Sequence, residues 1–294
     1  IQSKYDLVAQ NQAQVCVSEQ QAMSKMDHAN IIKLFASFQD TDFVYMLLEM
    51  ANGGELFSLI FERPIDEDQF LPEDQARFYA FVIGDAMAYM HEQKYVFRDL
   101  KPENVLISNT GYPTIIDFGF AKIVEPSEKT FTLCGTPKYI PPEMILQQGH
   151  SYGADHWALG VVIYEMLCGE NPFWEDGLDD MELYRGIIQD DYVKPTQGSS
   201  HAHDLIRQLL EKDDTRRLGN LAGGERDVTS HPWFTGLDLG QIQSRQALAP
   251  WVPPIKDEFD ASCFDDWSEL EDKTEQTYPP LDEEEEKLFA GFAS

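Results

Sequence analysis

Two short segments on either side of a predicted hairpin carry side chains that suit phosphoryl transfer. The first, FRDLKPEN, contains Asp99, Lys101 and Asn104, and the second, DFG, begins with Asp117. Because a hairpin returns the chain to its starting point, the two segments meet, and these four side chains can converge. Two carboxylates, an ammonium group and an amide oxygen suit a metal-bound phosphate that faces a hydroxyl nucleophile.

The same two segments also have a purely structural interpretation. Pro-Glu-Asn can begin a short helix, and Asp-Phe-Gly can form a turn. Either motif alone would leave that interpretation about as good as the catalytic one. Both motifs together, at this spacing around a hairpin, favour a catalytic site.

The elements that would position these residues follow from the spacing of apolar side chains. Val15, Ala22 and Met26, with Met23 beside them, repeat at helical spacing and predict a helix that carries Glu19 on the same face. Other predicted elements are strands 34–38 and 43–48 joined by a polar turn, an amphipathic helix 76–91, the hairpin strands 105–107 and 114–116, and a buried helix 157–168. The segment 250–254 is expected to end the compact part, and a tail rich in proline and acidic residues follows.

The charge balance narrows the class of partner. The chain has 22 Lys plus Arg against 52 Asp plus Glu over 294 residues, a formal net charge of −30. This excludes a general nucleic-acid binder and favours cationic partners. Fourteen of the acidic residues, with two lysines, lie in the tail at 257–294. Apolar residues at 43% and aromatic residues at 12% predict a folded core.

The cysteines and the chain ends indicate an intracellular location. Four cysteines lie far apart with no short paired spacing, which fits a reduced, cytoplasmic chain rather than a disulfide scaffold. No stretch approaches the ~20 consecutive apolar residues of a transmembrane helix. No signal-peptide pattern follows Ile1. The chain opens without Met, so we expect it to be a piece of a longer protein.

The order of the motifs resembles that of a eukaryotic protein kinase. The motifs are FRDLKPEN, DFGFAK, TLCGTPKY, PPE, DHWALGVVIYEM and TRRLGN. TLCGTP, HPWF and FDDW narrow the resemblance to the AGC group, and the chain is most similar to cAMP- or cGMP-dependent kinases. The resemblance implies an α+β, protein-kinase-like bilobal fold with an incomplete N-lobe and a mostly α-helical C-lobe. It places a partial N-lobe at 1–50, the C-lobe at 51–234 and an acidic C-terminal tail at 235–294.

The resemblance also implies ATP and Mg²⁺ as cofactors and assigns the reacting groups. Asp99 would orient the substrate hydroxyl and accept its proton. Lys101 would stabilise the transferring phosphoryl group and favour Ser/Thr acceptors. Asn104 and Asp117 would hold the magnesium ions.

The ATP-binding residues implied by the resemblance are Glu19, Glu49, Ala51, Leu106 and Phe264. Glu19 would pair with an ATP-positioning lysine; alternatively it is an exposed acid beside an apolar stripe. Phe264, with Trp267, matches the tail aromatics that reach the adenine pocket.

The end of the tail matches a further motif of the group. Residues 289–292 resemble the terminal hydrophobic motif that docks on the small lobe. A disordered acidic end is an equally good interpretation of these residues. The run 282–286 is expected to be a solvated charge run.

The resemblance implies basic peptides or proteins as substrates. Glu55, Glu103 and Glu165 match positions that read arginines upstream of the acceptor, because carboxylates bind Arg in bidentate pairs. The alternative is a set of solvated surface acids. Thr136 matches the threonine that contacts the catalytic Asp and Lys. Lys138 replaces a usual Glu and removes one acidic contact.

The resemblance also implies a phosphorylated activation loop and a structural ion pair in the large lobe. Thr132 matches the phosphorylated residue of the activation loop, with Arg98 and Lys122 as its cationic partners. Val15 replaces the helix His that often joins them. Glu143 and Arg217 match a buried ion pair of the large lobe.

The Gly-rich loop and the strand lysine of the family are not found within residues 1–294. By resemblance the lysine would lie 19 residues before Glu19, immediately before Ile1. We favour an active kinase of which this chain is a piece, because all four reacting groups are present. The alternative is a kinase-like pseudoenzyme or scaffold that binds basic partners. Residues 1–294 on their own are expected to bind ATP weakly and transfer little phosphate, and any regulatory domain or subunit lies outside them.

Overall fold

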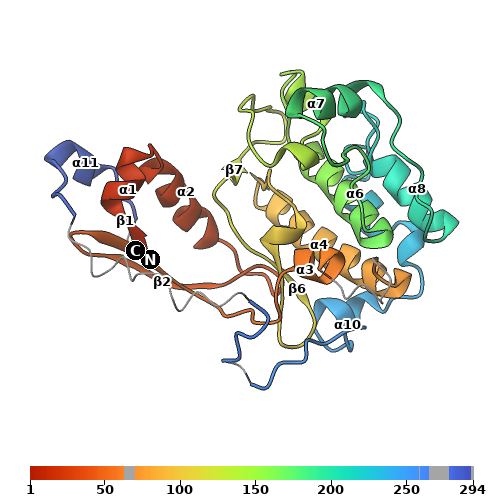
Figure 1. The fold of residues 1–294 in the computed structure, drawn as a ribbon, viewed down its shortest axis with the longest axis horizontal. Helices are drawn as coiled ribbons and strands as arrows, with labels where there is room; N and C mark the ends of the chain where they lie inside the picture. The colour runs from red at the N-terminus through yellow and green to blue at the C-terminus, as the bar shows by residue number, and fades with distance from the viewer. Residues whose placement is uncertain (63–69, 258, 265–277, 293–294) are drawn as a thin grey trace.

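The computed structural model describes residues 1–62, 70–257, 259–264 and 278–292. Figure 1 shows two parts: a small part that holds a sheet and helices α1, α2 and α11, and a larger part made mostly of helices. The chain passes between them near residue 50.

The small part is built on a three-stranded antiparallel sheet with the order β1-β3-β2. Its strands are β1 (Gln2–Ser3), β2 (Leu34–Gln39) and β3 (Phe43–Leu48). The Asp40 carboxylate accepts the backbone N–H groups of Asp42 and Phe43 at 2.9 and 2.8 Å, which closes the turn between β2 and β3. Both predicted strands are confirmed, β3 with the predicted bounds and β2 one residue longer.

Helices α1 (Lys4–Ala9) and α2 (Ala13–Met23) accompany this sheet. The apolar residues expected on one face of α2 are buried, with the exception of Val15. Ala22, Met23 and Met26 are buried, although Met26 lies beyond the end of the helix, whereas Val15 is 44% exposed. The other buried residues of α2 are Ala13, Cys16, Val17 and Gln20. Val15 shares a face with Glu19 that lies towards Gly119: a Cβ atom added to Gly119 would lie 4.0 Å from Val15 Cγ1.

Backbone hydrogen bonds anchor the small part to a hairpin of the large part. The hairpin pairs β5 (Val105–Ile107) with β6 (Pro113–Ile115). Ile32 N donates to Ile115 O at 2.9 Å, and Gly53 N donates to Ile107 O at 2.8 Å. A Cβ atom at Gly53 would lie 2.7 Å from Ile107 O, so this close approach requires glycine.

The large part is a helical bundle with short strands at its edge. Its helices are α3 (Leu56–Phe61), α4 (Glu73–Glu92), α5 (Pro142–Ile145), α6 (Gly153–Cys168), α7 (Asp180–Gln189), α8 (Ser200–Leu209), α9 (Glu225–Thr229) and α10 (Leu239–Gln243). Its remaining strands, β4 (Tyr95–Val96) and β7 (Lys122–Ile123), pair with each other, and 3₁₀ turns lie at Pro102–Asn104, Pro137–Tyr139 and Pro232–Phe234. The predicted hairpin is confirmed, with β6 shifted by one residue.

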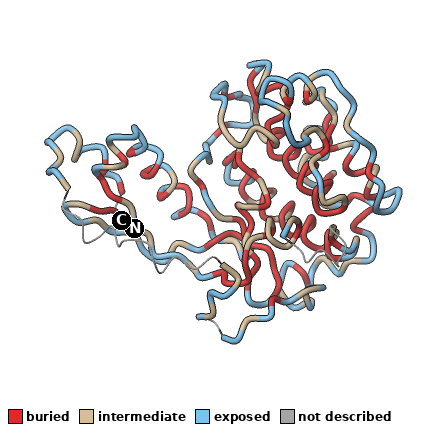
Figure 2. Tube along the Cα trace, in the orientation of Figure 1, coloured by how far each residue is buried: buried red, intermediate tan, exposed pale blue. Residues whose placement is uncertain are grey.

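Helix α6 lies at the centre of the large part. All of its residues from Gly153 to Leu167 are buried, as expected for a helix that is apolar on nearly every side. It packs between α4 and α8, and Figure 2 shows buried residues concentrated along these helices. The predicted helices are confirmed, although α4 and α6 begin three and four residues earlier than expected.

The expectation that the compact part ends at 250–254 is wrong, because the tail packs along both parts. Asn52 Nδ2 donates to the carbonyl oxygens of Asp257 and Asp260, each at 3.1 Å, so the tail crosses the connection between the two parts. Farther along, Phe289 and Phe292 are 0% exposed and pack with α1, α2 and β3. Burial of two whole phenyl groups outweighs the charge of the acidic tail at this point.

The charge run expected to be solvated forms a short helix, α11 (Glu283–Lys287), capped by the Asp282 side chain. Glu286 Oε2 lies 3.1 Å from Lys4 Nζ, which joins this helix to α1. A disordered end is therefore excluded for residues 278–292. No helix in the described residues is long and apolar enough to span a membrane.

Candidate active site

The β5–β6 hairpin brings together the two segments that sequence analysis singled out. Val105 pairs with Ile115 and Leu106 with Thr114, so the chain before β5 and the chain after β6 lie side by side. Ile116 N donates to Asn104 O at 3.0 Å, which joins the two segments directly.

Asp99 lies at the centre of a tight hydrogen-bond network and is 4% exposed. Its Oδ1 accepts Thr136 N at 3.0 Å and Thr136 Oγ1 at 2.9 Å, and its Oδ2 accepts Asn104 Nδ2 at 2.9 Å. Lys101 Nζ lies 3.2 Å from Asp99 Oδ2 and donates to Thr136 Oγ1 at 2.9 Å. The structure therefore places Asp99, Lys101, Asn104 and Thr136 in one rigid cluster.

Asn104 and Asp117 present oxygen donors suited to a hard cation. Asn104 Nδ2 donates to the backbone oxygen and the carboxylate of Asp99, so its amide oxygen remains available as an acceptor. Asp117 has a φ of 64°, and its Oδ1 accepts Gly119 N at 3.0 Å. A left-handed backbone is rare for a residue with a Cβ atom and is common at functional sites. Amide and carboxylate oxygens are the ligands that Mg²⁺ prefers, so the residues fit this ion.

Glu19 reaches across from α2 to the segment that contains Asp117. Its carboxylate is hydrogen-bonded to the backbone N–H of Phe118. The pKa of Glu19 is raised to about 7: burial is the largest cause, the charge of Asp117 adds to it, and the Phe118 N–H opposes both. Two carboxylates held near each other create a negative field that a cation would relieve.

The other predicted ATP-binding residues lie around the connection between the two parts. Glu49 N donates to Lys33 O at 2.8 Å, Ala51 is buried, and Leu106 lies on β5 half-buried. Phe264 is half-buried and follows Cys263, whose Cβ would lie 3.2 Å from a Cβ atom at Gly54. Trp267 lies outside the described residues.

Two of the three predicted substrate acids line one cavity of about 500 Å³, together with Thr136, Lys138 and Trp174. Glu165 is 2% exposed and accepts Tyr139 Oη at 3.0 Å and Asn171 Nδ2 at 2.8 Å. Burial raises its pKa to about 8 despite these donors. Glu103 Oε2 is buried and has no hydrogen-bond partner in the described part of the chain, so the cavity presents an unsatisfied acceptor.

Glu55 is not brought into this group. Glu55 is the N-cap residue of α3, and its backbone forms an isolated antiparallel β-bridge with Leu106. Phe57 and Phe61 of α3 line the cavity instead. Lys138 also faces the cavity, with Nζ 3.2 Å from the centroid of the Trp174 ring.

The predicted regulatory residues lie near one another, but they are not bonded to Thr132. Thr132 is exposed; Arg98 Nε donates to Phe120 O at 2.7 Å, and Lys122 Nζ donates to Thr130 Oγ1 at 2.9 Å. Arg98 Nη1 is buried with no partner among the described residues. An added anion could satisfy this nitrogen.

Sequence analysis missed Asp155, whose side chain is hydrogen-bonded to the backbone just before Asp99. Asp155 is 0% exposed, and it accepts the backbone N–H groups of Phe97 at 2.8 Å and Arg98 at 2.7 Å. Its Oδ2 also lies 2.7 Å from His91 Nε2. The available signal was an acidic residue at the start of a helix that is otherwise almost wholly apolar.

Glu143 and Arg217 form a bidentate ion pair in the interior. The Nη1 and Nη2 atoms of Arg217 donate to the two carboxylate oxygens of Glu143 at 2.6 and 2.9 Å. Their side chains are 0% and 3% exposed, so the pair is almost fully removed from water.

Comparison with known proteins supports the resemblance noted in the sequence. Residues 2–234 match the protein kinase domain family. The chain is 39% identical to a cAMP-dependent protein kinase catalytic subunit of Arthrobotrys oligospora, over 90% of this chain and 50% of that protein. It is 38% identical to the human cAMP-dependent protein kinase catalytic subunit PRKX, over 98% of this chain and 77% of that protein.

A cGMP-dependent protein kinase of Drosophila melanogaster is 36% identical to the chain, over 90% of this chain and 28% of that protein. The chain thus spans about half or less of the length of several curated relatives that it matches. The mixed α and β architecture agrees with the predicted kinase-like fold. This chain belongs to the protein kinase domain family.

Proposed function

We propose that the protein is a Ser/Thr protein kinase that transfers the γ-phosphate of ATP to Ser or Thr in Arg-rich peptides. The observation that carries this proposal is the cluster around Asp99: a buried carboxylate held by Thr136 and Asn104, with Lys101 beside it. The kinase family and the names of the relatives support the same reaction.

The chemistry assigned to the chain's own residues is mainly positioning and electrostatics. Three hydrogen bonds from neutral donors hold the Asp99 carboxylate in place, so it can align an incoming hydroxyl group. The same carboxylate accepts the proton of that hydroxyl group. Lys101 places a positive charge beside that carboxylate, where negative charge develops on the acceptor side. Asn104 and Asp117 would hold the metal ions, and the Glu19 carboxylate would add to the negative potential at Asp117.

Bound ATP and Mg²⁺ supply the phosphoryl group and the neutralising charge. The Ser/Thr preference rests on Lys101, and control through the activation loop rests on Thr132 with Arg98 and Lys122. A regulatory domain or subunit that responds to a cyclic nucleotide is proposed from the names of the relatives. We also propose a cytoplasmic location.

The direct test is phosphate transfer by the full-length protein that contains residues 1–294. With Mg²⁺ and labelled ATP, we expect label on a Ser or Thr peptide with arginines upstream and much less on the matched Tyr peptide. Peptide binding without turnover would instead support the alternative, a kinase-like scaffold for basic partners.

The preference for arginine is proposed from the cavity that Glu103 and Glu165 line. The unsatisfied Oε2 of Glu103 and the buried Glu165 leave the cavity short of positive charge. A guanidinium group is planar, carries five donors and binds carboxylates bidentately, so it suits this cavity better than an ammonium group. Lys138 keeps its own charge over Trp174 at one wall.

At pH 9, where Glu165 is ionised, Glu165→Gln is expected to raise the KM for the Arg peptide by about 10- to 100-fold, because a hydrogen bond to a charged group contributes about 1.5–3 kcal/mol. In the wild type, kcat/KM for this peptide should rise between pH 7 and 9. The raised pKa of Glu165, about 8, means that the carboxyl group is largely neutral at pH 7 and ionised above it. Arginine stays charged throughout this range.

The matched control is the same peptide with its arginines replaced by alanine. Its kinetics should change little in the Glu165→Gln variant, and the variant should lose the pH-dependent rise on the Arg peptide. An unchanged KM for the Arg peptide would contradict the assignment of this cavity to arginine while leaving the phosphotransfer proposal intact.

A further inference from the structure

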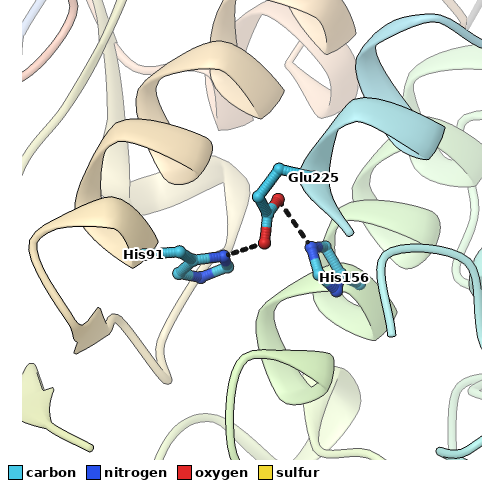
Figure 3. Close-up of side chains that lie close together, drawn as sticks. All are labelled: His91, His156 and Glu225. Carbon is cyan, nitrogen blue, oxygen red and sulfur yellow. Dashed lines mark hydrogen bonds and ion pairs between the residues drawn. The ribbon is translucent and has the colours of Figure 1, made fainter. Parts of the chain in front are cut away.

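Two histidines and a glutamate converge away from the candidate active site, where three helices meet (Figure 3). His91 lies near the end of α4, His156 near the start of α6, and Glu225 at the first position of α9. Their nearest ligand atoms all lie within 4.8 Å of one another. His91 and His156 are 134 and 69 residues from Glu225 along the chain, so the fold alone assembles the cluster.

The two imidazole rings face the same carboxylate. His91 Nδ1 lies 2.6 Å from Glu225 Oε1, and His156 Nε2 lies 2.9 Å from Glu225 Oε2. The two histidine side chains are 3% and 2% exposed, whereas Glu225 is 26% exposed. The cluster therefore has a buried wall of two nitrogen donors and one side that water can reach.

A fourth residue orients the first histidine. His91 Nε2 lies 2.7 Å from Asp155 Oδ2, and the Asp155 side chain is 0% exposed. This contact keeps a proton on Nε2 and directs Nδ1 towards Glu225. A carboxylate behind a histidine is the usual way in which proteins orient a metal-binding imidazole and raise its basicity.

The second histidine has no described partner on the ring nitrogen that is turned away from Glu225. His156 Nδ1 is buried and has no hydrogen-bond partner in the part of the chain that the structure describes. Without metal, the Glu225 carboxylate, 2.9 Å from Nε2, favours the proton on Nε2, and zinc would have to displace that proton to Nδ1. The tautomer that leaves Nε2 free as a ligand is available.

We propose that His91 Nδ1, His156 Nε2 and a Glu225 carboxylate oxygen form a zinc site, with water in the fourth position. Two imidazoles and one carboxylate are a donor set typical of Zn²⁺, whereas Mg²⁺ and Ca²⁺ prefer oxygen donors alone. Tetrahedral coordination at 2.0–2.1 Å separates ligands by about 3.3 Å. The two histidine–carboxylate distances, 2.6 and 2.9 Å, reach that value with a small outward movement of Glu225, the ligand nearest to solvent. The two ring nitrogens lie within 4.8 Å of each other, so zinc would also draw the two imidazoles together.

Protons are the competing occupants of the cluster. Without metal, His91 faces a carboxylate with each ring nitrogen, so both nitrogens carry protons. Zinc binding releases the Nδ1 proton of His91 to solvent and moves the His156 proton from Nε2 to Nδ1. No electron is transferred, and the Glu225 and Asp155 carboxylates balance the two positive charges of the ion.

Zinc at this position would join α4, α6 and α9 through one ion. Asp155 also accepts the N–H groups of Phe97 and Arg98, so two side chains, His91 and Asp155, would connect the metal to the segment that contains Asp99. We expect a structural site, whose occupancy raises the melting temperature, rather than a site for substrate.

The test is zinc binding by the full-length protein after removal of metals with a chelator. Equilibrium dialysis against ZnCl₂ with excess Mg²⁺, followed by metal analysis, should show one zinc ion per chain and a raised melting temperature. His156→Gln and Glu225→Gln should each abolish both effects. The matched controls are His201→Gln, at an exposed histidine, and Asp117→Asn, in the candidate active site. Both controls should still bind one zinc ion and show the raised melting temperature.

Co²⁺ substitution gives a second readout that does not depend on the variants. Visible d–d bands of tetrahedral nitrogen and oxygen coordination would support the site, and intense thiolate charge-transfer bands would assign the metal to a cysteine and overturn it. Circular dichroism should show that each variant is folded. If a variant is unfolded, the wild type decides: no zinc bound by the folded protein overturns the proposal, as does full binding in a folded cluster variant.

Discussion

Asp99→Asn in the full-length protein is expected to lower kcat for phosphate transfer by about 10²- to 10⁴-fold, the range for loss of a positioned proton acceptor. The asparagine side chain has the same shape, so peptide and ATP can still occupy their sites. Its amide cannot take the proton of the hydroxyl. The KM values for ATP and peptide should therefore change much less than kcat.

Asp99→Asn is also expected to lower the stability of the folded protein. In the wild type, Asp99 Oδ2 accepts Asn104 Nδ2 and lies beside Lys101 Nζ. An amide nitrogen in that position would face two donors, which costs about 1–3 kcal/mol. A thermal melt measures this loss and separates it from the catalytic effect.

The matched control for Asp99 is Asp27→Asn, which makes the same chemical change at an exposed position. It should leave kcat and the melting temperature close to those of the wild type. A kcat for Asp99→Asn within a few-fold of the wild type would contradict the role of Asp99 and, with it, the proposed mechanism.

Arg217→Met is expected to lower the free energy of unfolding by about 3–5 kcal/mol, the range for breaking a buried ion pair. The variant leaves the Glu143 carboxylate, 3% exposed, with no cation opposite it. It also removes the donors to the carbonyl oxygens of Gly153 and Glu211, each at 2.9 Å. Urea unfolding of the full-length protein and of the variant measures the difference.

Two further variants show whether burial causes this large loss. Arg207→Met removes the arginine of a pair with Asp204 whose side chains are 63% and 43% exposed, so a loss of about 0–1 kcal/mol is expected. In the double variant Arg217→Met, Glu143→Met, the unpaired charge disappears, and part of the stability should return. Equal losses for Arg217→Met and Arg207→Met would contradict the explanation based on burial.

Local patterns in the sequence were enough to place the main elements and much of the candidate site. Strand β3 has its predicted bounds, and the hairpin around residue 110 brings the segments at 99–104 and 117–119 together as expected. These features depend on alternation, turn residues and short loops, which act over a few positions of the chain. The family resemblance then identified Thr136 as a contact of Asp99 and Lys101, and the structure places it there.

Errors arose where burial depends on a distant segment. Val15 is apolar and at helical spacing, yet it is exposed, because α2 buries the face that meets β3 and the two tail phenylalanines. Composition alone could not decide between a disordered end and a docked hydrophobic motif at 289–292. The docked alternative is confirmed, because Phe289 and Phe292 pack with residues of α1, α2 and β3 more than 200 positions earlier in the chain. Helical periodicity identifies which side chains share a face but not which face is covered.

By itself, the sequence determined the kinase-like fold, the motif residues around Asp99 and the acidic character that favours basic partners. The tertiary structure decided that Glu103 and Glu165 share a cavity that Glu55 does not line, and that Asp155 supports the segment around Asp99. It also assembled His91, His156 and Glu225 from three helices. The physical reason is range: motifs depend on neighbours in the chain, whereas cavities, buried charges and metal-ligand clusters depend on side chains that only packing brings within a few ångströms.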